Sequence, residues 1–132
     1  MQDWKIKISM LWLFKDLALL AALTLGSLEP GVLEEFLSTG TISGIVIGPE
    51  VLLLFAVLVL VPLMMAFLSL ILNGSTNRWS NITLGIVFTV LGLIDLAETA
   101  ANPSAWAILI GLAEIAATML IVWYAWKSKQ KT

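Results

Sequence analysis

Cysteine and histidine are both absent from the 132 residues of this chain. Without them the chain has no means to form disulfides, perform thiol redox chemistry, build a Cys/His zinc site, ligate haem through histidine or use histidine as a general acid or base. Most familiar enzyme classes are therefore excluded, and we expect no resident cofactor.

Charged residues are also scarce, at 12% of the chain, whereas hydrophobic residues make up 60% and the mean hydropathy is +1.01. This composition is typical of an integral membrane protein and not of a soluble domain. The net charge is −2 and no basic cluster occurs beyond a short tail, so the sequence lacks the basic patch that nucleic-acid binding requires. We expect a single membrane domain over residues 1–132, with the lipid bilayer as its surroundings.

Four apolar stretches are long enough to cross a bilayer, which takes about 20 residues of helix. They cover approximately 9–28, 49–72, 81–101 and 105–126, and Pro62 should kink the second of them. Between the first two stretches, 30–37 is predicted to form a short helix on the membrane surface and 38–48 a loop. Residues 73–80 are predicted to form a polar turn. The predicted fold class is all-α, a four-helix transmembrane bundle with a short interfacial helix in the first outer loop.

The basic residues predict the orientation of this bundle, because lysine and arginine are retained on the cytoplasmic side during insertion. All seven lie at the N-terminal end, in the second loop or after the fourth span: Lys5, Lys7, Lys15, Arg78, Lys127, Lys129 and Lys131. We therefore expect a multi-pass protein of the cell membrane with both termini cytoplasmic.

Small and polar residues recur at helical spacing along three of the spans and predict the faces on which helices pack. The stripes comprise Ala18, Ala22 and Gly26 in the first span, Asn81, Gly85, Gly92, Asp95 and Thr99 in the third, and Ala107, Gly111, Glu114, Thr118 and Ala125 in the fourth. Carboxylates are therefore expected on packing faces and not toward lipid.

Four carboxylates are the candidate proton- or cation-binding residues: Asp95, Glu114, Glu98 and Glu50. With a 1.5 Å rise per residue, Asp95 and Glu114 lie about 9 and 13 Å below the outer ends of their spans. No lysine or arginine is expected at that depth, so the carboxylates cannot all stay ionised unless a proton or a cation offsets their charge. Whether a metal ion binds is open. Alternatively, Asp95 and Glu114 are structural polar contacts between helices, and Glu50 only complements a helix N-terminus.

Lys15 and Asp16 lie within the first span. The lysine stem is expected to extend toward the cytoplasmic interface and Asp16 to pair with it or with a nearby lysine, as a structural anchor.

Several short runs resemble those of a known family: KIKISMLW at 5–12, PGVLEE at 30–35, NRWSNI at 77–82, EIAAT at 114–118 and WYAW at 123–126. They are similar to a family of small prokaryotic four-helix membrane proteins of unknown function. The resemblance implies four spans and no established activity.

Three functional hypotheses follow. The chain is an oligomeric channel or a proton- or cation-coupled transporter that uses the outer carboxylates. Alternatively, it is a binding or accessory subunit that docks a partner helix or a lipid, with the carboxylates as structural contacts. The third is an intramembrane enzyme acting on a lipid-soluble substrate, which the lack of a nucleophile or metal set disfavours. A homo-oligomer or a membrane partner is expected, because four short helices largely fill their own interior.

Overall fold

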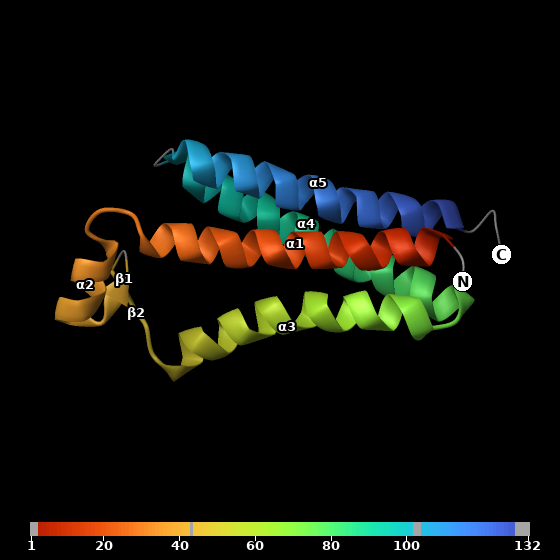
Figure 1. Ribbon diagram of the computed structural model, residues 1–132, viewed down its shortest axis with the longest axis horizontal. Helices are drawn as coiled ribbons and strands as arrows, with labels where there is room; N and C mark the ends of the chain where they lie inside the picture. The colour runs from red at the N-terminus through yellow and green to blue at the C-terminus, as the bar shows by residue number, and fades with distance from the viewer. Residues whose placement is uncertain (1–2, 43, 102–103, 129–132) are drawn as a thin grey trace.

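The computed structural model describes residues 3–42, 44–101 and 104–128. Four long helices lie side by side: α1 (Asp3–Ser27), α3 (Pro49–Ile71), α4 (Gly74–Ala101) and α5 (Ala105–Lys127) (Figure 1). Each is long and apolar enough to cross a membrane. The prediction of an all-helical protein with four helices long and apolar enough to cross a membrane is therefore confirmed.

A short segment beyond α1 connects it to α3. It contains the helix α2 (Val32–Thr39) and two short antiparallel strands, β1 (Thr41–Ile42) and β2 (Ile45–Val46). The Glu35 carboxylate accepts hydrogen bonds from the Thr41 hydroxyl and the Gly44 amide, at 2.7 and 3.1 Å, and so ties the strands to α2. The short helix predicted at 30–37 is present, shifted by two residues, and the predicted loop contains a small hairpin. That α2 lies on the membrane surface stays a prediction.

The helix α1 is central to the bundle, because it packs against both α3 and α5, and α5 in turn packs against α4. We call the end where α1 begins and α5 ends the terminal end, and the opposite end the α2 end. Figure 1 shows α3 alongside α1 near the terminal end and bent away from it toward the α2 end. Pro62 lies inside α3, and a proline bends a helix because it removes a backbone donor and crowds the preceding turn.

The hydrophobic core lies in the half of the bundle nearer the terminal end. It is formed by Trp4, Ile8, Trp12, Met65, Ala66, Ile82, Phe88, Ile121 and Ala125. Trp12 and Phe88 meet edge to face with ring centroids 5.7 Å apart, a favourable geometry for aromatic pairs. Most of the buried apolar side chains of the bundle therefore lie in this half.

A buried polar network accompanies this core. The Asn81 side-chain oxygen accepts hydrogen bonds from the Trp12 indole at 2.7 Å and from the Ser69 hydroxyl at 3.1 Å. Its amide nitrogen donates to the backbone and side-chain oxygens of Asn77, and Asn77 donates to the carbonyls of Ser69 and Leu72 at the end of α3. The network thus joins three helices.

The predicted polar turn at 73–80 is wrong, because α4 already begins at Gly74. Asn77 fits inside a helix here since its amide donates to carbonyls at the end of α3 instead of competing for its own backbone. The connection between α3 and α4 is therefore very short.

Glycines allow α4 and α5 to approach closely, as the small-residue stripes predicted. A methyl group added at Gly85 would lie 2.6 Å from Val122 Cγ2, and one added at Gly92 would lie 2.9 Å from Ile115 Cγ1. Both distances are shorter than any real contact of this kind, so α4 and α5 pack backbone against side chain at these positions.

We expect Gly85→Ala to lower the free energy of unfolding by about 1–3 kcal/mol, the usual effect of overpacking a close contact. Gly74→Ala is the matched control, because nothing lies within 4 Å of the methyl group that it would add. Thermal unfolding of the two variants in detergent measures the difference. Equal stability of both variants would contradict the close approach.

Candidate functional site

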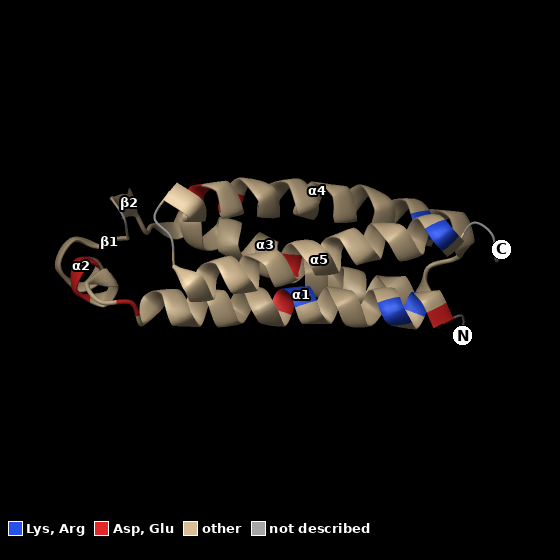
Figure 2. Cartoon of the chain, turned by 90° about the horizontal axis from the view of Figure 1, so that it is seen from above, with Lys and Arg blue, Asp and Glu red and all other residues tan. Residues whose placement is uncertain are grey.

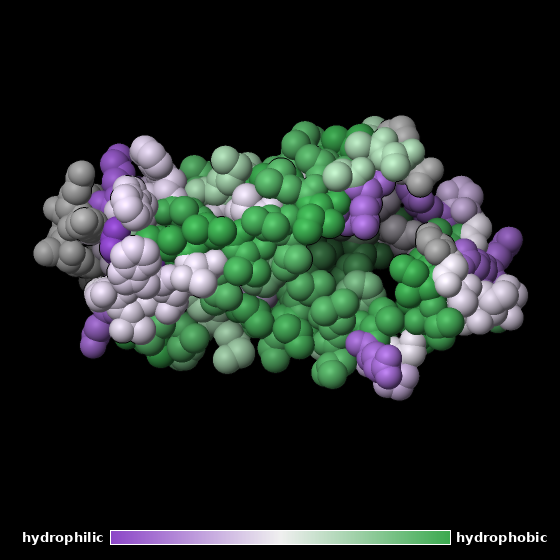
Figure 3. All heavy atoms as spheres, turned by 180° about the vertical axis from the view of Figure 1, so that it is seen from behind, coloured by the Kyte–Doolittle hydropathy of each residue, from purple (hydrophilic) through white to green (hydrophobic). Residues whose placement is uncertain are grey.

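The candidate site is a cavity of about 410 Å³ near the middle of the bundle, where α3 diverges from the other helices. Its walls are largely apolar and come from all four long helices, and Figure 3 shows that the molecule is hollowed on the face seen from behind, toward the α2 end. The charged residues that line it are Lys15 on α1, Asp95 on α4 and Glu114 on α5. Three helices therefore bring ionisable groups to one space.

Lys15 and Glu114 form an ion pair across this cavity. The lysine Nζ lies 3.7 Å from Glu114 Oε1, and their side chains are 7% and 14% exposed. The same ammonium lies 4.5 Å from the centre of the Phe88 ring, close enough for a cation–π interaction. Lys15 is thus held inside the bundle.

Two sequence-based predictions about charge are therefore wrong. Lys15 does not extend to the interface, and a cation is present beside the deep carboxylates. Figure 2 shows most basic residues at the terminal end, with a single basic position in the middle of α1 next to acidic positions of α1 and α5. The physical reason is that α1 begins at Asp3, six residues before the predicted start of the first span, and this puts Lys15 about 18 Å into the helix.

The four predicted site residues do not all come together. Glu114 and Asp95 line the cavity, and Asp95 is close enough to act electrostatically on Glu114. Glu98 is exposed on α4 and Glu50 is exposed in the first turn of α3, and neither lines the cavity. Among the described residues no three acidic side chains are grouped closely enough to hold a metal ion.

Asp16 is a further ionisable residue that sequence reasoning treated as an anchor. Asp16 is only 1% exposed, and neither of its carboxyl oxygens has a hydrogen-bond partner. In the described part of the chain it forms no ion pair, so the predicted pairing with Lys15 is wrong. The only signal in the sequence was an acidic residue near the middle of an apolar helix.

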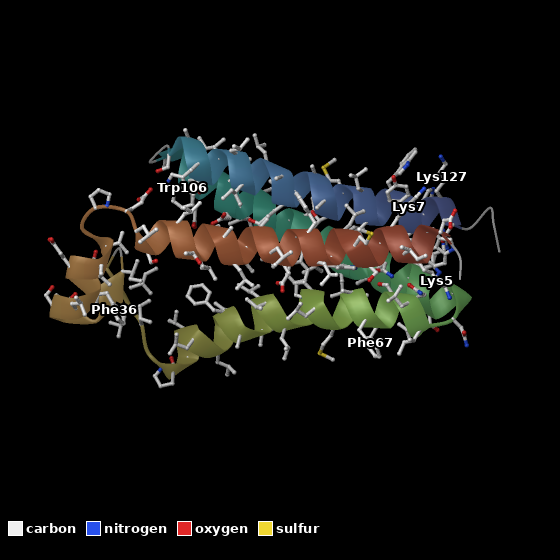
Figure 4. All side chains as sticks on the ribbon, viewed as in Figure 1. Lys5, Lys7, Phe36, Phe67, Trp106 and Lys127 are labelled. Atoms are coloured by element: carbon white, nitrogen blue, oxygen red, sulfur yellow. The ribbon has the colours of Figure 1, made fainter. Side chains whose placement is uncertain are left out.

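Beyond the cavity, Glu29 closes the α2 end of the bundle. Its carboxylate accepts hydrogen bonds from the Trp106 indole at 2.8 Å and the Ser104 hydroxyl at 3.2 Å, and thereby joins the end of α1 to the start of α5. Figure 4 shows Trp106 at that end of α5, and Lys5, Lys7 and Lys127 at the terminal end. Trp106 also lines the cavity, so this contact shapes its wall.

Four apolar helices around a partly charged cavity define a multi-pass helical membrane protein. The chain belongs to a family of unknown function, DUF6326, whose model matches residues 2–132. The resemblance to an uncharacterised family is thereby confirmed. No curated protein and no solved structure matches the chain.

Proposed function

We propose that the protein is a small proton- or cation-linked transporter or channel of the cell membrane, with the central cavity as its binding site. The observation that supports this most is that Asp95 and Glu114 line one cavity together with Lys15. Polar residues that only hold helices together are usually sealed between them, whereas these carboxylates border an open volume. Charged groups within membrane helices commonly mark an ion or proton pathway.

The charges of the cavity favour the uptake of one positive charge. Two carboxylates and one ammonium carry a net charge of −1 when all are ionised, so a single proton or monovalent cation neutralises the cavity. A proton on Glu114, or a cation close to it, competes with Lys15 for the carboxylate. Uptake of positive charge therefore weakens the contact between α1 and α5 that the ion pair makes.

The size and walls of the cavity indicate what else it accommodates. A volume of about 410 Å³ lies within the range of small-molecule sites, which is roughly 300–1,000 Å³. Leu19, Leu58 and Ile110 are among the apolar residues that line it. A small, partly apolar solute with a positive charge fits this combination.

Orientation and assembly are part of the proposal. The basic side chains at the terminal end favour a cytoplasmic location of that end. Glu98 is exposed on α4 and lies outside the cavity, although α4 is apolar enough to cross a membrane. Because exposed carboxylates are costly in lipid, this face favours a second copy of the chain or another membrane partner packed against α4.

Proton flux into proteoliposomes is the direct test. A pH-sensitive dye inside the vesicles should report faster acidification than in protein-free vesicles when a potential is imposed with potassium and valinomycin. Glu114→Gln should reduce the rate to the protein-free background, because it removes the carboxylate that exchanges between Lys15 and the proton. Glu98→Gln is the matched control, since Glu98 lies outside the cavity, and it should keep the original rate.

Two results oppose the proposal. An undiminished rate of acidification in Glu114→Gln would show that the Glu114 carboxylate is not part of the proton pathway. No flux in the unsubstituted protein, with stable assembly around α4, would instead support the second candidate, a non-transporting accessory subunit. The exposed Glu98 carboxylate of α4, outside the cavity, is the observation that favours that candidate.

A further inference from the structure

Asp16 lies outside the cavity and is more deeply buried than any of the cavity carboxylates. Neither of its oxygens has a hydrogen-bond partner. An ionised carboxylate in such a place costs several kcal/mol, and the group usually takes up a proton instead. A neutral carboxylic acid has one O–H group that can donate, whereas a carboxylate only accepts.

The helical period of α1 shows which neighbour Asp16 faces. Asp16 follows Ser9 by seven residues, which is about two turns, so both residues share one face of α1. The Ser9 hydroxyl donates a 2.6 Å hydrogen bond to the Ala66 carbonyl of α3. Because α1 and α3 run in opposite directions, seven residues forward along α1 correspond to about seven residues back along α3. Asp16 therefore lies level with the turn of α3 that contains Leu58. Lys15, the residue before Asp16, lines the cavity together with Leu58. This independently places this part of α1 at the same height along the bundle as Leu58 of α3.

That turn of α3 contains a backbone carbonyl without its usual donor. The carbonyl of Leu58 would normally accept from the amide of residue 62, but Pro62 has no N–H group. Asp16 is fully buried, so water does not satisfy its carboxyl group, and Pro62, which leaves the Leu58 carbonyl without its helical donor, is buried as well. One interface therefore holds an acid that lacks a partner and an acceptor that lacks a donor.

We propose that Asp16 is a proton-binding site in the interface of α1 and α3, where the neutral acid donates to the Leu58 carbonyl freed by Pro62. Release of this proton leaves an unpaired charge against α3 and loosens that helix from α1. Since α3 already diverges from α1 toward the α2 end and supplies Phe55 and Leu58 to the cavity wall, its movement widens the cavity. This inference stands whether or not the cavity conducts protons.

The charged groups around Asp16 determine how its proton is held. The nearest charged residue on α1 is Lys15, and the charged residue on α5 that interacts with Asp16 is Glu114. On α4 the charged residue is Asp95, which interacts electrostatically with Glu114. On α3 the only acidic residue is Glu50, at the far end of the helix. Lys15 is drawn toward Asp16 when Asp16 ionises, and this competes with the ion pair between Lys15 and Glu114.

Infrared spectroscopy tests whether Asp16 holds a proton. The unsubstituted protein in lipid at neutral pH should show the C=O stretching band of a protonated carboxylic acid, and this band should be absent in Asp16→Asn. Glu98→Gln is the matched control and should retain it. A band that persists unchanged in Asp16→Asn would overturn the proposal.

Pro62→Ala tests the proposed hydrogen bond without altering the acid. This substitution supplies an amide to the Leu58 carbonyl, so the carboxylic acid loses its acceptor and its C=O band should move to higher wavenumber. A band at the same position in Pro62→Ala and in the unsubstituted protein would overturn the assignment of Leu58 as the acceptor.

The movement of α3 is measurable because the chain has no cysteine of its own. Spin labels on Thr24→Cys in α1 and Leu54→Cys in α3, both exposed positions, report the separation of the two helices. The distance should lengthen as the pH is raised, and adding Asp16→Asn should hold it at the shorter value at every pH. An unchanging distance in the doubly labelled protein, or equal lengthening with Asp16→Asn, would show that Asp16 does not control α3.

Discussion

Lys15→Met is expected to lower the free energy of unfolding by about 3 kcal/mol, the lower end of the range for breaking a buried ion pair. The substitution keeps the unbranched apolar stem of the side chain but leaves the Glu114 carboxylate without its cation. The Phe88 ring also loses the ammonium that lies 4.5 Å from its centre. The loss stays at the lower end because Glu114 borders a cavity and can take up a proton there.

Adding Glu114→Gln to Lys15→Met should restore most of this stability, because the buried carboxylate that Lys15 neutralises is then absent. Reversible unfolding in mixed micelles measures both variants, and Glu98→Gln serves as the control for losing an exposed carboxylate. If the double variant is as unstable as Lys15→Met alone, the ion pair is not the source of the effect.

Asn81→Leu is expected to destabilise the protein by a similar amount, about 3 kcal/mol. The leucine side chain has the same number of heavy atoms in the same branched arrangement, but it leaves the Trp12 indole, the Ser69 hydroxyl and the Asn77 side-chain oxygen without their partner. Each lost hydrogen bond contributes about 1 kcal/mol, and Asn81 is 0% exposed, so water does not replace it.

The control for this variant is Asn73→Ala, which removes an exposed amide from the connection between α3 and α4. Unfolding midpoints in detergent compare the two variants, and the indole N–H resonance of Trp12 reports directly on its hydrogen bond. That resonance should shift in Asn81→Leu and stay in place in Asn73→Ala. An unshifted resonance in Asn81→Leu would mean that Trp12 does not donate to Asn81.

Composition and periodicity were sufficient to predict four apolar helices and the faces on which two of them pack. Gly85 and Gly92 lie where the stripes placed them, because only a residue without a side chain lets α5 come so close to α4. Polarity alone was a poor guide to the ends of helices. Asn77 is polar, yet it lies inside α4, since its hydrogen-bond acceptors are at the end of another helix.

The partner of Lys15 could not be predicted for a related reason. A helical wheel shows which residues of one helix share a face, but not which helix lies opposite that face. Lys15 and Glu114 lie at nearly equal distances, about 18 and 20 Å, from the terminal end along α1 and α5. The match becomes visible only when both helices are given their full length and α1 is known to pack against α5.

The pairing of Lys15 with Glu114 also has a consequence for biosynthesis. The ribosome delivers α1 first, and α1 is the least hydropathic of the four long helices. Until α5 has been synthesised and inserted, Lys15 of α1 lacks the Glu114 carboxylate, which is its ion-pair partner in the folded protein. A chain that stalls before α5 therefore exposes the Lys15 ammonium, whereas the folded chain buries it against α5.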